Sequence, residues 1–338
     1  MQTVFLNPSQ NSKYHFGDFG LESSSLIFHS DSLFSAIVNN YLKLYGESEL
    51  NKDIKEIKKI KLSSVFPAVE IDNEKIYFIP KPKIKLNFRE RDKEKIEEKP
   101  KDIKKIQFIS LGVLGNHNKN EVEFSKDLII DGKFLITREE SEKIGKIEKI
   151  FVKGLEEKVW VSRGYKTGNE KREEGEPYTV EFIKPMKKLV FYFVYDDKNV
   201  EETIKKKIRA SIQLMVDEGL GGKLTSGAGH FEKLEFSNCN LFDNPEGNGY
   251  LNISLVIPNN AEEFDKCKFY TLLERKGYVF SEKTKTQRKK SIVMVEEGSI
   301  FSQNIEGKIA DVKPDDYNHP VYKFGCFYGI PIKVNDNE

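Results

Sequence analysis

The sequence has 338 residues, and its 55 Lys and Arg nearly balance its 54 Asp and Glu, which gives a formal net charge of +1 at pH 7. This balance excludes recognition of a polyanion by a global excess of positive charge, so any RNA site must be a local cluster of cations. Three widely spaced cysteines without a C-x-x-C pattern exclude a disulfide framework and a zinc ribbon and indicate a reducing compartment. The length favours two domains.

The N-terminal residues predict neither a signal peptide nor a membrane anchor. They read as a short strand over residues 3–6, without a basic region followed by an apolar one. No window of the sequence approaches eighteen apolar residues. We therefore expect a cytoplasmic protein that makes no contact with a membrane.

A helix is predicted to begin near residue 30. Apolar side chains recur at helical spacing from Leu33 to Tyr45, and Gly46 is expected to end the helix. Ser30 or Asp31 can cap its first turn, because short polar side chains accept hydrogen bonds from free main-chain amides there.

The next 120 residues combine short strands with a highly charged segment. Residues 65–71 and 76–79 read as two strands. Residues 88–100 carry almost no apolar side chains and are expected to form an exposed or mobile insertion. Residues 115–118 are expected to be a loop, and 126–137 a short hairpin that turns at Asp131-Gly132.

Residues 158–218 have the strongest secondary-structure patterns in the chain. Residues 158–182 alternate around a polar tip and predict a long hairpin, and residues 189–195 predict a buried strand. Residues 201–218 predict an amphipathic helix with an isoleucine stripe, which ends at Gly219. The polar stretch 238–248 marks the boundary, and a β-rich second domain follows.

The chain is organised around a glycine-rich loop that joins this helix to the next strand. Residues 219–229, GLGGKLTSGAG, contain five glycines, one lysine and two hydroxyl side chains. Glycine allows a partner to approach the main chain closely, so free amides can line up on phosphate oxygens. The loop is neither a Walker loop, because Leu224 follows Gly222-Lys223, nor a dinucleotide fingerprint, because the order of helix and strand is reversed. An ordinary flexible connector remains the alternative.

This loop resembles the signature loop of the RAMP superfamily of CRISPR systems. Three further segments support the resemblance: residues 28–36 (FHSDSLFSA), 160–168 (WVSRGYKTG) and 319–325 (HPVYKFG). More narrowly, the chain resembles the subunit of type III-A (Csm) effector complexes that caps the 5′ end of the guide RNA (crRNA).

The resemblance implies an α+β fold in two domains. Residues 1–237 would form a ferredoxin-like (RRM-like) βαββαβ domain, with insertions over about 85–185 that include a thumb hairpin at about 158–183. Residues 248–338 would form a second β-rich domain, which can be read as a degenerate ferredoxin-like copy. In such a unit the start of the first helix would lie near the glycine-rich loop, and both would face one phosphate path.

The resemblance also implies a non-catalytic function without cofactor or metal. The chain would bind the 5′ tag of crRNA and join a neighbouring RAMP backbone subunit to the large polymerase/cyclase-type subunit in antiviral defence. In the thumb, Arg163 and Lys166 would contact phosphate and Tyr165 would stack on a base. The other expected RNA-binding residues are Gly219, Gly221, Gly222, Lys223, Thr225, Ser226, Gly227, Gly229, His29 and Ser30.

Three alternatives remain open at this stage. A metal-independent endoribonuclease would use His29 as general acid or base. A metal-dependent nuclease would use Asp31, although no second carboxylate stands nearby in the sequence to share a metal ion. A pure interaction scaffold would leave the RNA to neighbouring subunits. The basic run 283–290 would suit an RNA contact, a subunit contact or a solvated loop equally.

Overall fold

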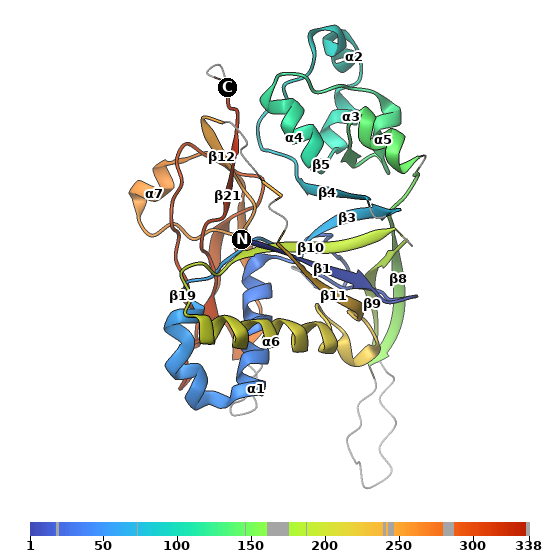
Figure 1. The fold of residues 1–338 in the computed structure, drawn as a ribbon. Helices are drawn as coiled ribbons and strands as arrows, with labels where there is room; N and C mark the ends of the chain where they lie inside the picture. The colour runs from blue at the N-terminus through green and yellow to red at the C-terminus, as the bar shows by residue number, and fades with distance from the viewer. Residues whose placement is uncertain are drawn as a thin grey trace.

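The chain folds around one large sheet, from which an inserted helical part and a C-terminal β-rich part extend (Figure 1). The computed structural model describes residues 1–17, 20–72, 74–145, 147–160, 176–186, 188–238, 241–242, 247–279 and 287–335. Its mixture of helices and strands confirms the predicted α+β class. Of the described helices, none is long and apolar enough to cross a membrane.

The large sheet has nine strands in the order β11-β1-β10-β3-β4-β5-β7-β6, with β2 pairing β10 beside this path. Strands β5 and β7 pair in parallel, and the other pairs are antiparallel. The bounds are β1 (Gln2–Pro8), β2 (Lys61–Leu62), β3 (Phe66–Ile71), β4 (Glu74–Pro80), β5 (Phe108–Ser110), β6 (Ile129–Ile130), β7 (Phe134–Leu135), β10 (Leu189–Asp196) and β11 (Phe231–Ser237). Strand β10, the predicted buried strand, lies between β1 and β3, so the sheet joins segments from both sides of the insertion.

Two helices, α1 (Ser30–Ile57) and α6 (Glu202–Glu218), pack against each other on one face of this sheet (Figure 1). The predicted isoleucine stripe of α6 is buried, and Lys207 on its flank pairs with Glu49 and Asp53 of α1 at 3.0 and 2.7 Å. Gly46 breaks α1 with φ 78°, and the chain then resumes its helix. The prediction that Gly46 ends the first helical segment is therefore confirmed.

The inserted part contains more helix than the sequence predicts. Its helices are α2 (Lys93–Glu98), α3 (Pro100–Lys105), α4 (Leu111–Asn118) and α5 (Arg138–Ile144), with single 3-10 turns at Glu90–Asp92 and Lys126–Leu128. The loop expected at 115–118 is wrong: Ser110 accepts a hydrogen bond from the Val113 amide at 3.1 Å and caps α4, whose Val113 and Leu114 are buried. The charged segment 88–100 is largely exposed, as expected, but forms helix because its carboxylates and lysines suit short helical turns.

The hairpin predicted over 126–137 is confirmed, since β6 and β7 pair around Asp131 and Gly132, which have φ 51° and 65°. Next along the chain, Thr137 begins α5 with a capping box: its hydroxyl accepts from the Glu140 amide at 3.1 Å, and the Glu140 carboxylate accepts from the Thr137 amide at 2.8 Å.

We expect Thr137→Ala to lower the free energy of unfolding by about 1 kcal/mol, because one amide of the first turn of α5 loses its acceptor. Chemical denaturation of the two proteins measures this difference. Ser125→Ala is a control, because Ser125 makes no side-chain cap at its 3-10 turn and its hydroxyl donates to the exposed Asp127 carboxylate. An equal loss in both variants would contradict a specific role for the capping box.

The predicted long hairpin is confirmed as the ribbon of β8 (Phe151–Trp160) and β9 (Glu176–Pro185), which are paired along their whole length. It begins earlier than the sequence pattern indicates. Arg163, Tyr165 and Lys166, the residues expected to contact RNA in the thumb, lie outside the described residues.

The C-terminal part is β-rich, as predicted. Strands β13, β18, β12 and β21 form one sheet in that order, and three two-stranded ribbons surround it. The elements are β12 (Gly249–Asn252), α7 (Ala261–Asp265), β13 (Cys267–Phe269), β14 (Leu272–Arg275), β15 (Tyr278–Val279), β16 (Gln287–Arg288), β17 (Ile292–Val295), β18 (Ile300–Phe301), β19 (Ala310–Asp311), β20 (Tyr322–Lys323) and β21 (Gly329–Ile332).

Candidate nucleic-acid interface

The glycine-rich loop between α6 and β11 follows a path that requires its glycines. Gly219, Gly221, Gly227 and Gly229 have φ of 98°, 98°, 76° and 83°, a region that L side chains rarely adopt. Between them Lys223 is left-handed, with φ 63° and ψ 29°, and Leu224–Ser226 form one right-handed 3-10 turn. The backbone conformation of the loop therefore requires glycine at these four positions.

One side of the loop is held by residues 13–16, which precede α1. The Gly222 amide donates to the His15 carbonyl at 2.8 Å, and the Gly229 amide donates to the Lys13 carbonyl at 2.8 Å. A Cβ atom on Gly221 would lie 2.7 Å from the His15 oxygen, so the two main chains approach as closely as glycine permits. The Leu220 amide closes the loop on the Gly229 carbonyl at 2.9 Å.

The other side of the loop offers main-chain donors. Three consecutive amides, those of Lys223, Leu224 and Thr225, donate no hydrogen bond to any described residue. A left-handed residue followed by right-handed ones turns successive amides toward one point, the arrangement called a nest, which binds anions. Thr225, Ser226 and Gly227 are exposed beside it. This side of the loop can therefore accept a phosphate or carboxylate group.

Cations surround the root of the β8–β9 ribbon next to the loop. Lys13 pairs with Glu156 at 2.6 Å, and Lys158 and Lys184 lie 3.9 and 3.8 Å from the same carboxylate. Hydrogen bonding from Lys13, together with the charges of the three lysines, lowers the pKa of Glu156. The Lys223 ammonium lies over the Tyr178 ring at 4.8 Å. One carboxylate among three lysines leaves local positive charge beside the free amides.

His29 and Ser30 lie at the start of α1, but their side chains contact the C-terminal part. His29 is 5% exposed, and its Nδ1 lies 2.8 Å from Oε1 of the buried Glu297, which also accepts from the Ser64 hydroxyl. The Ser30 hydroxyl accepts from the Leu255 amide at 2.9 Å. The expected N-cap role of Ser30 is therefore wrong: His29 occupies the N-cap position, without a side-chain cap bond.

The Asp31 carboxylate forms ion pairs with two cations of the C-terminal part. It is fully buried, and its carboxylate accepts from Arg275 Nε and Nη2, both at 3.0 Å, and from Lys323. Burial opposes ionisation of the carboxyl, but Lys323 and Arg275 outweigh burial and hold its pKa well below the ordinary value. Asp31 thus ties the first helix to β14 and β20, and it also accepts from the Ser32 amide of the first turn at 2.7 Å. Its carboxylate is not free to bind a metal ion.

The sequence contains few signals for these contacts. Asp31 and Arg275 are 244 residues apart, and His29 and Glu297 are 268 residues apart. The HPVYKFG segment did carry one signal, since its Lys323 is the second cation on Asp31. No pattern in the sequence singles out His15, whose carbonyl accepts from the Gly222 amide and holds the glycine-rich loop.

Comparison with known proteins identifies relatives named Csm4. The family model described as the CRISPR Csm4 C-terminal domain matches residues 245–332. The chain is 37% identical to the CRISPR system protein Csm4 of Methanocaldococcus jannaschii, with 96% of each chain covered. It is 26% identical to Csm4 of Streptococcus thermophilus, with 92% of each covered.

Solved structures give the same result. The chain is similar to a chain of the Csm3-Csm4 subcomplex of a type III-A CRISPR-Cas interference complex, with 33% identity, a TM-score of 0.71 and coverage of 98% of this chain and 99% of that one. A chain of a Csm1-Csm4 cassette in complex with AMPPNP has the same fold at 18% identity, with a TM-score of 0.60 and coverage of 99% and 98%.

Proposed function

Because the chain belongs to the Csm4 family, we propose that it is a non-catalytic subunit of a type III-A CRISPR effector complex that binds the 5′ tag of crRNA through its glycine-rich loop. The observation that carries this proposal is the group of three free amides at Lys223, Leu224 and Thr225, on a loop whose other side is fixed to residues 13–16. Phosphate oxygens accept such amides well because the hydrogen bonds are charge-assisted.

The proposed partners follow from the assemblies in which the relatives occur. The similar structures are of a Csm3-Csm4 subcomplex and a Csm1-Csm4 cassette. We infer that this chain likewise contacts a backbone subunit and a large subunit and links the two. We also infer a cytoplasmic location, because the proposed complex would bind its guide RNA there.

A non-catalytic function is supported by the surroundings of the two residues on which the nuclease alternatives depend. His29 is almost completely buried against Glu297, so its imidazole is poorly placed to exchange a proton with RNA in solvent. The Asp31 carboxylate is occupied by two cations. Within the described residues, no group of three or more His, Cys, Asp or Glu is placed to hold a metal ion.

We further infer that β1, α1, β3, β10, α6 and β11 are the ferredoxin-like unit. Their strands stand in the order β11-β1-β10-β3, all antiparallel, with both helices between strands of this set in the chain. This is the order expected of a βαββαβ unit whose second and third strands are separated by an insertion. The domain boundary proposed at 238–248 agrees with a family match that begins at residue 245.

Charge reversal at Lys223 tests the RNA contact. We expect Lys223→Glu to weaken binding of crRNA and to reduce the slope of log K against log salt concentration by about 0.7 for every phosphate that the protein no longer neutralises. Titration of the protein with labelled crRNA at several salt concentrations measures both. Lys206→Glu, on the exposed side of α6, makes the same charge change away from the loop. A salt slope equal to that of this control would remove Lys223 from the site.

A further inference from the structure

Residues 333–335, which follow β21, lie between the inserted part and the C-terminal part. Among the described helices and strands, none of the inserted part packs extensively against one of the C-terminal part. The contact between the two parts therefore depends on loops and on this short segment, which we call the tail.

One side of the tail is bound to the C-terminal part. Asn248 Nδ2 donates to the Val334 carbonyl at 2.9 Å, and the Val334 amide donates to Asn248 Oδ1 at 2.7 Å. Asn248 directly precedes β12, and β12 pairs with β21 up to Ile332. The two bonds therefore extend this pairing and keep the tail on the C-terminal sheet.

The other side of the tail is bound to the inserted part. His117 Nε2 donates to the Lys333 carbonyl at 2.9 Å, and Asn118 Oδ1 accepts from the Lys333 amide at 2.9 Å. Asn335 Nδ2 donates to Asn87 Oδ1 at 2.6 Å. These three hydrogen bonds, which we call the tail latch, join the end of α4 and the segment before it to the C-terminal part.

The partners of His117 require a neutral imidazole. Its Nδ1 accepts from the Asn87 amide at 3.0 Å, and its Nε2 donates to a carbonyl, so only Nε2 carries a proton. A proton on Nδ1 would face the Asn87 N–H group, donor against donor. The His117 side chain is also fully buried, so water cannot solvate the added charge. Protonation of His117 therefore removes a hydrogen bond and leaves a buried cation.

The charges around His117 do not offset this cost. Burial lowers the pKa of His117, the hydrogen bond to the Lys333 carbonyl raises it, and the Lys333 charge lowers it again. The single acid on the segments that hold His117 is exposed. The charged residues on these segments are Lys85, Arg89, Lys119, Glu121 and Lys333.

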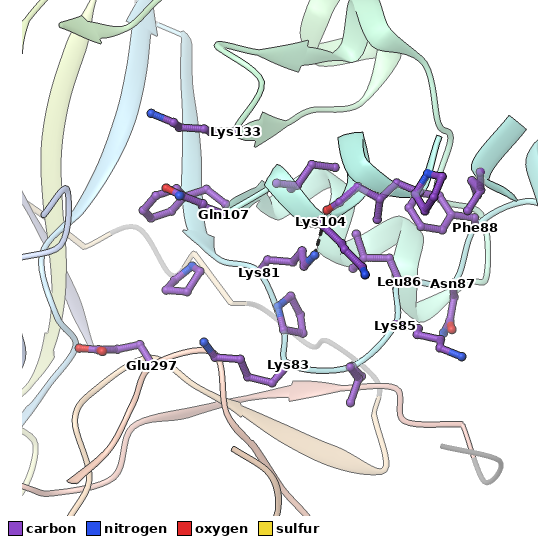
Figure 2. Close-up of a pocket in the computed structure, with 18 of the residues that line it drawn as sticks. Lys81, Lys83, Lys85, Leu86, Asn87, Phe88, Lys104, Gln107, Lys133 and Glu297 are labelled. Atoms are coloured by element: carbon purple, nitrogen blue, oxygen red, sulfur yellow. Dashed lines mark hydrogen bonds between the residues drawn. The ribbon is translucent and has the colours of Figure 1, made fainter. Parts of the chain in front are cut away.

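The tail latch lies in the wall of a cleft of about 1570 Å³ between the inserted part and the C-terminal part, because Asn87 and Asn335 both line this cleft. Figure 2 shows Asn87 at its edge, on the segment that follows β4. Nearer to β4 the same segment has a second contact with the C-terminal part, since the Lys83 amide donates to the Gly298 carbonyl at 2.9 Å. Separation at the latch therefore widens the cleft on the Asn87 side.

We propose that the tail latch is a releasable contact, which holds the inserted part against the C-terminal part while His117 is neutral and opens when His117 is protonated. The contact of Lys83 with Gly298 remains as the hinge. The inference concerns two parts of this chain and does not depend on the proposed binding of crRNA.

The direction of the pH dependence follows from the buried, neutral imidazole. An open latch exposes His117 to water, where its pKa returns to about 6.5. The closed latch is therefore fully stabilised above about pH 6.5, and its equilibrium weakens up to about tenfold for each pH unit below that value, until the lower pKa of the closed state is reached.

Hydrogen exchange of the complete protein above and below about pH 6.5 tests the proposal, with rates corrected for the intrinsic effect of pH on exchange. The reporting amides are those of Asn87 and Lys333, whose acceptors are His117 and Asn118. We expect their protection to fall up to about tenfold from pH 6.5 to about pH 5.5, while the amides of α6 stay protected.

Two histidine variants separate the latch from a general effect of acid. His117→Gln keeps an acceptor and a donor but does not titrate, so its Asn87 and Lys333 amides should keep their protection in acid. His230→Gln removes an exposed histidine and should behave as the unaltered protein does. An equal loss of protection in the unaltered protein and in His117→Gln would overturn the proposal, and so would a loss that includes α6.

A third variant decides the question if His117→Gln does not fold, which circular dichroism checks. Asn118→Ala removes the acceptor of the Lys333 amide and leaves His117 in place. Its Lys333 amide should exchange faster at both pH values, while its Asn87 amide should still lose protection in acid. Exchange at Asn87 that does not change with pH would contradict release through His117.

Discussion

Replacement of Asp31 by alanine is expected to lower the free energy of unfolding by about 3–5 kcal/mol, the cost of leaving buried partner charges uncompensated. Arg275 and Lys323 are 7% and 5% exposed, so water cannot replace the carboxylate in this place. Chemical denaturation followed by circular dichroism measures the loss. The contact joins α1 to the C-terminal part. In the Asp31→Ala variant, the C-terminal part should therefore unfold before the rest of the chain as denaturant is added.

A surface pair provides the matched control for Asp31. Glu218 pairs with Lys43 at 2.6 Å, but the two side chains are 39% and 54% exposed. Glu218→Ala should therefore cost less than about 1 kcal/mol. If Asp31→Ala were no more destabilising than Glu218→Ala, the buried contact would not be holding the two parts together.

The dependence on pH follows from the direction of the Asp31 pKa. Because the folded protein holds this pKa below the value in the unfolded chain, the stabilisation is present above the ordinary aspartate pKa of about 3.9 and is lost as the pH falls through the lower, folded value. The stability difference between the unaltered protein and Asp31→Asn should thus stay constant from neutral pH to about pH 5 and shrink only in stronger acid.

Valine at Gly227 is expected to reduce retention of crRNA roughly tenfold or more, because loss of one or two amide–phosphate bonds costs about 1.5–3 kcal/mol. Gly227 has φ 76° and open space around it, so valine strains the backbone without colliding with a neighbour. At Gly221 valine would also collide with the His15 carbonyl and displace residues 13–16. Gly221→Val should therefore lose both stability and RNA.

Gly132 offers a control that shares the backbone strain. Its φ is 65° and it too has open space around it, but it lies in the β6–β7 turn of the insertion. Gly132→Val should cost a similar amount of stability and leave crRNA retention unchanged. The RNA that co-purifies with each variant, measured per mole of protein, decides the comparison. Equal retention in the Gly227 and Gly132 variants would count against the loop as the RNA site.

How far the fold follows from the sequence depends on the range of each interaction. Helix α6 and strand β10 are predicted because their patterns repeat within a few residues. Helix α4 is missed because its two glycines and two asparagines are typical of loops, while the packing of Val113 and Leu114 overrides that preference.

In the candidate site, too, the sequence predicts the local features and misses the contacts between distant residues. The glycine-rich loop can be recognised from its own residues, but its attachment to Lys13 and His15 joins segments about 200 residues apart. Asp31 is visible in the sequence as a helix-start residue, whereas its pairing with Arg275 needs the fold.

The central claim is that main-chain amides of the glycine-rich loop hold the sugar-phosphate backbone of crRNA. A structure of the effector complex with its guide RNA tests it most directly. We predict phosphate oxygens within hydrogen-bond distance of the amides of Lys223, Leu224 and Thr225. An RNA path over another face of the protein, with this loop covered by protein side chains, would contradict the claim.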